Sequence, residues 1–300
     1  MRTRTKIWLI IATCLVLLGC ILFAGVMTTL KWDFMKLTTV NYDINTYEIS
    51  KSFDSISMNS DTADITFALS DDGKCTVVCH EEENAKHSVT VEDGTLTIEL
   101  IDERSVHDFI GLNFDTPEIT VYLPKTEYTS LFIDESTGDI KIPKGFKFGS
   151  AEISLSTGDI EFFADVAQLL KFGTSTGDIR IENIAAGTLD LSVSTGNVHL
   201  TDIKCQSLIS SGDTGDIFLK GVIAEKKFSI IRNTGHIKFD GCDAGEIFAE
   251  TDTGSVKGSL LTEKIFIAQS DTGSIDVPKT VTGGKCEIIT DTGDIKIETK

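Results

Sequence analysis

Apolar and polar residues alternate on both sides of a repeated Thr-Gly dipeptide, and this pattern fills the C-terminal half of the chain. Nine copies of Thr-Gly follow one another at intervals of 19 or 20 residues, with the Thr at positions 137, 157, 176, 195, 214, 234, 253, 272 and 292. The residue two positions after each Gly is Ile or Val in every copy. A hydrophobic period of two predicts β-strands rather than helices.

A coil of 19–20 residues holds two or three short strands with their corners, which is one turn of a parallel β-solenoid, or β-helix. One coil cannot bury its apolar face alone, whereas stacked coils bury a continuous column. The Gly suits a corner that needs a positive φ and has no room for a Cβ. We therefore expect an all-β fold with a parallel β-solenoid over residues 131–300. An antiparallel barrel of hairpins is the competing fold, but hairpins require no constant coil length.

Residues 46–130 form an irregular, β-rich lead-in. Two alternating segments meet at Glu92-Asp93-Gly94, which is a hairpin turn signal. A further strand is predicted between Pro117 and Pro124. The segment Asp61–Ile65 repeats the corner motif with Ala in place of Gly, so we expect the solenoid to begin there in degenerate form.

The N-terminus carries an apolar segment, residues 7–30, without a single charge. A bilayer core takes about 20 apolar residues as a helix, so this segment predicts a transmembrane helix that contacts the lipid bilayer. Three basic residues precede it, which places residues 1–6 in the cytoplasm as a short tail. Residues 31–45 would be a stalk, and the chain from there to its C-terminus would be extracellular. The predicted location is the cell membrane, with a single pass.

Two alternatives remain for this segment. A cleaved signal peptide has a shorter apolar region, of about 7–15 residues. The sequence Leu17-Leu18-Gly19-Cys20 is similar to a bacterial lipoprotein box in which Cys20 would be lipidated, although the apolar run continues beyond it.

The N-terminal span, a Val-Tyr-Leu-Pro strand at residues 121–124 and the serial Ser-Thr-Gly-Asp-Ile repeats together resemble the bacterial "putative adhesin" β-strand-repeat family over residues 40–300. The departures are small: the Asp is replaced at Asn197, His236, Ser255 and Ser274, and Gly258 interrupts an apolar column. The resemblance implies a bacterial envelope protein of the Gram-positive type. It implies no activity.

The charge narrows the range of partners. The chain has 27 Lys and Arg residues against 46 Asp and Glu residues, a net charge of −19, and residues 31–300 alone carry −22. A nucleic-acid-binding surface needs a basic patch, so nucleic acid is excluded as a partner. The hydrophobic fraction of 41% is enough for a folded core.

The Cys and His residues give no clear site by themselves. Cys14 and Cys20 fall in the apolar span, and Cys75 and Cys79 lie four apart, a spacing that suits neither a strong disulfide nor a metal knuckle. Cysteines 205, 242 and 286 are isolated, and we expect all five outside the span to be buried as small hydrophobes. The five His residues, at positions 80, 87, 107, 199 and 236, are scattered and expected at the surface.

The sequence motifs favour a protein without catalytic activity. Asp252–Ser255 and Asp271–Ser274 spell the Asp-Thr-Gly-Ser of aspartic proteases, but here they are variants of the repeated corner and lack the preceding apolar residue. The chain has no G-x-S-x-G elbow, no H-E-x-x-H and no phosphate loop. A glycosidase would need paired carboxylates in a walled cleft. No coil is more than one residue longer than its neighbours, so long loops to wall a cleft are missing.

The corner carboxylates are the remaining candidates. Asp213 with Asp216, and Asp291 with Asp294, flank one Thr-Gly each. Carboxylates suit calcium among the common metals, but calcium takes six to eight oxygens and one pair supplies too few. We therefore expect weak calcium binding at most, no cofactor, and a solvated row of turns.

We interpret the chain as a non-catalytic, membrane-anchored β-repeat module displayed outside the cell, an adhesin or scaffold that contacts an envelope polymer or protein. One alternative is an envelope-stress sensor or assembly component that acts through protein partners. A second is a β-helix enzyme that acts on polysaccharides. The final strand alternates Lys296, Glu298 and Lys300 with uncharged residues, which predicts a charged terminal edge and a monomer.

Overall fold

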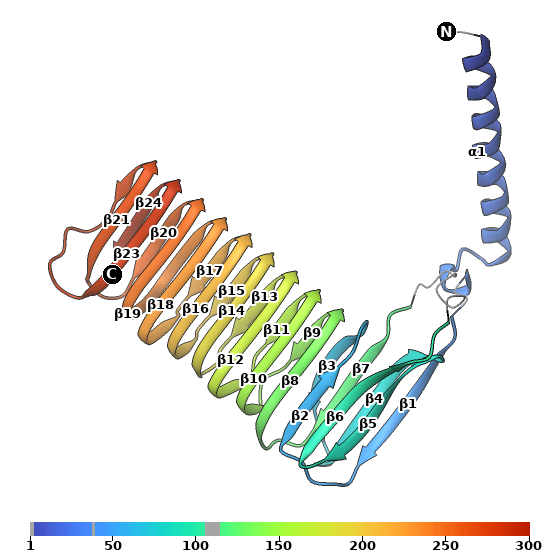
Figure 1. The fold of residues 1–300 in the computed structure, drawn as a ribbon, viewed down its shortest axis with the longest axis horizontal. Helices are drawn as coiled ribbons and strands as arrows, with labels where there is room; N and C mark the ends of the chain where they lie inside the picture. Colours follow the sequence, from blue (N-terminus) through green and yellow to red (C-terminus); the bar gives the residue numbers. More distant parts are fainter. Residues whose placement is uncertain (1–2, 38–39, 106–114) are drawn as a thin grey trace.

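The computed structural model describes residues 3–37, 40–105 and 115–300. It consists of an N-terminal helix, a β-rich lead-in and a long stack of parallel β coils (Figure 1). His107 and the first two residues of the expected cytoplasmic tail lie outside the described residues.

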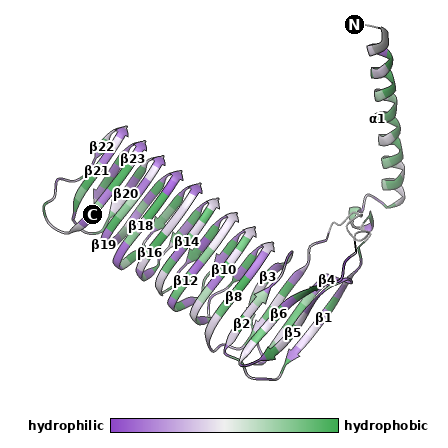
Figure 2. Cartoon of the chain, in the orientation of Figure 1, coloured by the Kyte–Doolittle hydropathy of each residue, from purple (hydrophilic) through white to green (hydrophobic). Residues whose placement is uncertain are grey.

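Helix α1 (Thr3–Thr29) contains a 25-residue stretch, Thr5–Thr29, that is long and apolar enough to cross a membrane. The most apolar part of this stretch is not buried against the rest of the protein, and Figure 2 shows it as largely hydrophobic. A short 3-10 helix, η1 (Phe34–Leu37), follows. The first strand already begins at Tyr42, so the stalk expected at residues 31–45 is shorter than predicted.

The lead-in contributes five strands that cover the first coil: β1 (Tyr42–Ile49), β4 (Cys75–Glu82), β5 (Ala85–Glu92), β6 (Thr95–Asp102) and β7 (Glu118–Leu123). Strand β4 pairs antiparallel with both β1 and β7, and β5 pairs antiparallel with β6. The β5–β6 hairpin turns at Asp93 and Gly94, whose φ angles are 48° and 78°. The predicted hairpin and the strand between Pro117 and Pro124 are confirmed.

The solenoid has two facing walls of parallel strands. One wall contains β2 (Ser55–Asn59), β8 (Glu127–Thr137), β10 (Lys147–Thr157), β12 (Asp165–Thr176), β14 (Ala186–Thr195), β16 (Lys204–Thr214), β18 (Ile223–Thr234), β21 (Lys264–Thr272) and β23 (Gly284–Thr292). The other contains β3 (Asp64–Leu69), β9 (Ile140–Ile142), β11 (Ile160–Phe162), β13 (Ile179–Glu182), β15 (Val198–Thr201), β17 (Ile217–Lys220), β20 (Val256–Leu260), β22 (Ile275–Asp276) and β24 (Ile295–Thr299). The long strand β19 (Ile237–Thr253) runs through both walls.

Equivalent residues of successive coils stack in register. Ile160, for example, lies between Ile140 and Ile179, and all three are completely buried. Parallel pairing throughout the repeats excludes the antiparallel barrel. The degenerate first coil is also confirmed, because Thr62 pairs with Thr137 and β3 pairs with β9.

The corner glycines hold the coils in close contact. Gly177 has a φ of 142°, and its N–H donates to the carbonyl of Thr195 in the next coil at 2.9 Å. A Cβ on Gly177 would overlap the carbonyl oxygen of Gly158 in the previous coil, and Gly215 meets Gly196 in the same way. Both predicted reasons for glycine, the positive φ and the lack of room, therefore apply at these corners.

The last coil in the sequence is not the last coil in space. Strand β23 lies between β19 and β21, and β24 lies between β20 and β22. The predicted charged terminal edge is therefore wrong: β24 is an inner strand, and the open edge is formed by β21 and β22. The chain skips one layer after β20, and residues 284–299 then return to fill it.

The open end exposes apolar side chains. Ile275 is 46% exposed, whereas its equivalents elsewhere in the stack are fully buried. Ile265 and Ile267 on β21 face away from the core, as the paired Lys285 and Glu287 do, and are exposed; β21 has no charged residue from 265 to 270. Val281 is on the loop that returns to β23 and is 88% exposed. Natural edge strands normally carry charges or Pro that prevent pairing with other chains, and residues 265–270 lack both.

A charged side chain, that of Arg232, lies inside the stack without a carboxylate partner among the described residues. Arg232 is 1% exposed. Its guanidinium donates to the hydroxyl of Ser210 at 2.9 Å and to the backbone carbonyl of Ile231. Burial lowers the pKa of Arg232 to about 10. The space for its side chain comes from Gly212 in the preceding coil, where a Cβ would lie 2.7 Å from Nη1.

Replacement of Gly177 by Val is expected to destabilise the solenoid. The φ angle alone costs about 1–3 kcal/mol, and the overlap with Gly158 adds to it. Thermal unfolding followed by circular dichroism measures the effect, with Gly215→Val as a second corner. The control is Gly173→Val on β12, where nothing lies within 4 Å of the added Cβ. Equal melting temperatures for the corner and control variants would contradict the stacking argument.

Candidate functional site

The residue after each corner Gly carries a side-chain acceptor for the backbone of the next coil. The Asp139 carboxylate accepts from the N–H of Asp159 at 2.9 Å, and Asp159 accepts from Asp178 at 2.7 Å. The ladder continues where the residue type changes: Asp178, Asn197, Asp216 and His236 accept from the N–H groups of Asn197, Asp216, His236 and Ser255. This position therefore requires an acceptor rather than a charge.

The first pair of calcium candidates lies on this ladder. Asp216 accepts the backbone N–H of His236 at 2.7 Å, and Asp213 accepts the side-chain amide of Asn233 at 3.0 Å. Each carboxylate thus has one oxygen engaged with a donor from the next coil. Calcium would have to use the other oxygens.

The two carboxylates of the second pair, Asp291 and Asp294, have different surroundings. Asp291 is exposed, whereas Asp294 accepts from both the backbone and the hydroxyl of Ser274, at 3.1 and 2.9 Å, and lies 3.1 Å from Lys257 Nζ. These contacts, the backbone hydrogen bond first, lower the pKa of Asp294 to about 2. Weak calcium binding at the two pairs stays a prediction.

A charged groove of about 610 Å³ runs across the outer face of β3, β9, β11, β13 and β15, beside the corners. The charged and imidazole side chains lining it are Asp64, Asp139, Lys141, Asp159, Glu161, Asp178, Arg180, Glu182 and His199. Opposite charges are paired, with Lys141 3.1 Å from Glu161 and Arg180 2.6 Å from Glu182. The His199 ring extends the groove by stacking on Phe218, with ring centroids 4.8 Å apart. This surface suits an extended polar polymer better than an apolar ligand.

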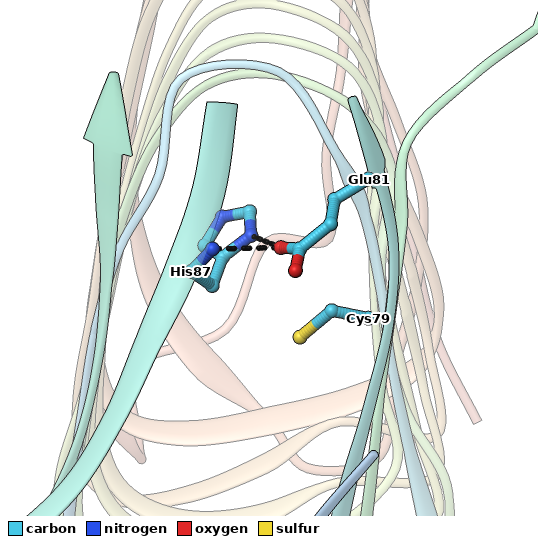
Figure 3. Close-up of side chains that lie close together, drawn as sticks. All are labelled: Cys79, Glu81 and His87. Carbon is cyan, nitrogen blue, oxygen red and sulfur yellow. Dashed lines mark hydrogen bonds and ion pairs between the residues drawn. The ribbon is translucent and has the colours of Figure 1, made fainter. Parts of the chain in front are cut away.

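A different cluster lies inside the lead-in. Strand β4 alternates strictly, so Cys75, Val77, Cys79 and Glu81 all point inward. His87 points inward from the facing strand β5, and Figure 3 shows its ring directed at Glu81, with Cys79 beside the carboxylate. His87 Nδ1 lies 2.7 Å from Glu81 Oε2, which also accepts the backbone N–H of His87. Burial would raise the pKa of Glu81, but hydrogen bonds from His87 and Asn45 outweigh it and lower the pKa.

This cluster continues into the first solenoid coils. His87 Nε2 lies 2.9 Å from the hydroxyl of Ser60, and Ser60 also bonds the carboxyl group of Glu135 on β8. Burial raises the pKa of Glu135 to about 8 against hydrogen bonds from Ala63, Ser60 and Thr137. Within the described chain, Oε2 of Glu135 has no hydrogen-bond partner. At neutral pH the Glu135 carboxyl group is therefore mainly protonated.

The sequence pattern does not by itself predict this cluster. The expectation that all His residues lie at the surface is wrong for His87, which is 4% exposed. The signal was present in the strict alternation of Cys75–Glu82, which turns Glu81 to the same face as the two cysteines. The expectation for the cysteines is confirmed, because all five outside α1 are buried and free. Asp252 and Asp271 of the protease-like motifs are exposed corner residues.

The family model Toastrack DUF4097 matches residues 53–298, which is most of the chain. The chain belongs to the Toastrack DUF4097 family. Among curated proteins, no match to the toastrack chain is found.

Solved structures similar to this toastrack protein carry the name "putative adhesin". The one from Parabacteroides distasonis has a TM-score of 0.54 at 13% identity, with 86% of this chain and 98% of the other covered. The one from Parabacteroides merdae has a TM-score of 0.52 at 12% identity, with coverages of 86% and 96%. The family resemblance drawn from the repeats is thus confirmed, and at these identities the likeness concerns the fold alone.

The buried Glu135 of the toastrack chain predicts a pH dependence of stability. The folded protein retains the Glu135 proton up to a pH of about 8, whereas the unfolded chain loses it near the ordinary pKa of 4.5. Since the unfolded state binds fewer protons in this window, stability falls as the pH rises from about 4.5 to 8, by up to about 1.4 kcal/mol per unit.

Glu135→Gln is expected to reduce this slope and to raise stability at pH 8. Denaturant unfolding at a series of pH values measures it, with Glu127→Gln, an exposed position on the same strand, as the control. A Glu135→Gln variant that keeps the wild-type slope would show that Glu135 titrates normally.

Proposed function

We propose that this toastrack protein is held in the cell membrane by α1 and displays its solenoid outside the cell as a non-catalytic binding module. The observation that carries the proposal is the apolar span of α1, of which the most apolar part is not buried against protein. A lipid bilayer is the environment that removes such a surface from water. The basic residues before α1 and the charge of −22 after it support a cytoplasmic N-terminus.

The groove supports an extended envelope polymer as the ligand. It crosses several coils, and it offers paired acidic and basic side chains together with the His199–Phe218 stack. Carboxylates and a guanidinium can bond hydroxyl, amide and charged groups of such a polymer, while an aromatic face packs against a ring.

A non-catalytic role is supported by the form of the corners. The corner carboxylates are used as acceptors for the next coil, and the coils are too uniform in length to wall a cleft that excludes water. The similar structures are named as adhesins rather than enzymes.

The open end of the solenoid favours a second candidate function, that of an assembly component acting through a protein partner. Exposed Ile265, Ile267 and Ile275 surround the unpaired edge of β21 and β22. A partner strand could pair with this edge and cover the apolar side chains.

Protease added to intact cells is expected to remove residues 31–300 and to leave a small membrane-bound stub. Immunoblots against an N-terminal and a C-terminal tag follow both parts, and a cytoplasmic protein that stays intact is the control. A C-terminal part that is protected until lysis would contradict external display. Release of residues 31–300 into the medium without protease would instead identify α1 as a cleaved signal sequence.

Full-length protein in detergent is expected to sediment with isolated cell-wall polymer, and Arg180→Glu is expected to reduce the bound fraction about tenfold. The matched control is Lys171→Glu, which breaks an equivalent exposed ion pair, with Glu152, on the other wall. Equal binding by both variants would contradict the groove. Loss of binding in Ile267→Lys alone would move the contact to the open end.

A further inference from the structure

We propose that Cys79, Glu81 and His87 form a zinc site in the lead-in. The Cys79 sulfur, a Glu81 carboxylate oxygen and a His87 ring nitrogen all lie within 4.8 Å of one another. They come from the facing strands β4 and β5 and point toward a common centre (Figure 3). This site is independent of the groove and of the membrane anchor.

The three donors match the chemistry of zinc. Zinc in proteins binds thiolate, imidazole and carboxylate at about 2.0–2.3 Å, which separates ligand atoms by roughly 3.3–3.8 Å in a tetrahedron. To reach this geometry, the 2.7 Å contact between His87 Nδ1 and Glu81 must open, and separations near the 4.8 Å limit must close by about 1 Å. Calcium and magnesium prefer oxygen donors only, so the Cys79 thiolate selects against them.

The charge of the site also fits a buried divalent ion. Cys79, Glu81 and His87 are 0%, 1% and 4% exposed. A thiolate and a carboxylate together cancel the charge of Zn²⁺, and a neutral imidazole adds none. The loaded site therefore buries no net charge, which avoids the main cost of placing an ion in the interior.

Neighbouring polar groups would orient the ligands. Metal-binding His residues usually donate their second N–H to a polar group, and His87 Nε2 already lies 2.9 Å from Ser60, which contacts Glu135. Glu81 Oε1 accepts from the side-chain amide of Asn45 at 2.7 Å. The buried Ser60 and Glu135 thus acquire a role as outer supports of the site.

A cavity adjoins the site at His87. His87 lines a cavity of about 140 Å³ together with Thr62, Ala85, Leu100 and Pro117, among others. Three protein ligands and one water are a common coordination of zinc. On binding, the thiol proton leaves to solvent as the sulfur–zinc bond forms. His87 Nδ1 must also be without a proton to bind zinc, so the neutral ring carries its proton on Nε2. Because zinc binding releases the thiol proton, it strengthens as the pH rises.

Cobalt(II) titration of the full-length protein, chelator-treated and kept in detergent, tests the proposal. We expect one equivalent of cobalt to produce a sulfur-to-cobalt charge-transfer band and tetrahedral d–d bands, and zinc to abolish both. The nearly isosteric Cys79→Ser is expected to lose the charge-transfer band. Cys75→Ser, a buried cysteine on the same face of β4, is expected to keep it. Ser60→Ala is expected to weaken cobalt binding roughly tenfold.

Folded wild-type protein without a sulfur-to-cobalt band would overturn the proposal, whether or not the variants fold. The same band in folded Cys79→Ser would also overturn it, because the sulfur would then belong to another residue. Neither result bears on the membrane display or on the groove, which are measured by protease and by sedimentation.

Discussion

The corner glycines set how closely the coils stack, and the other contacts of the solenoid depend on that distance. At each corner the backbone of one coil occupies the space that a side chain would need in the next, as at Gly158 and Gly177. This contact brings the Gly N–H within hydrogen-bonding distance of the next Thr carbonyl. It also places the residue after the corner Gly so that its side-chain acceptor reaches a backbone N–H of the next coil. The hydrogen-bond ladder at the corners, the register of the stacked strands and the columns of apolar core residues thus all follow from one backbone contact.

A stack of this kind must deal with its two ends, and here the ends differ. At the first coil the chain folds back into the antiparallel strands of the lead-in, which continue both walls and bury the apolar side chains. At the other end the C-terminal coil is inserted one layer inside, and within the described chain the coil of β21 and β22 keeps one edge without a strand partner, along which residues 265–270 are uncharged. One end is therefore covered by the protein's own lead-in, while the other keeps exposed apolar side chains.

The buried polar groups have distinct physical settings. Arg232 is accommodated in the stack because Gly212 leaves room for it, and no carboxylate of the described residues pairs with its guanidinium. Glu81, His87, Ser60 and Glu135 instead form a continuous chain of contacts from the lead-in to the first coils. A connected set of buried polar groups fixes the relative position of the elements that supply it. This chain therefore links the lead-in specifically to the start of the solenoid.

The regular part of this protein was readable from its sequence, because a 19–20-residue period with alternating apolar residues has few structural solutions. The repeat determined the parallel coils, the corner glycines and the degenerate coil at Asp61–Ile65. Single-coil patterns, however, say nothing about the order in which coils stack. The inserted position of residues 284–299 and the open edge of β21 were therefore decided only by the tertiary structure. The same holds for the buried cluster. Alternation along β4 turns Glu81 inward, but its contact with His87, and the contact of His87 with Ser60, depend on how β4 and β5 face each other. These two strands are not paired, so the sequence does not specify their relative position.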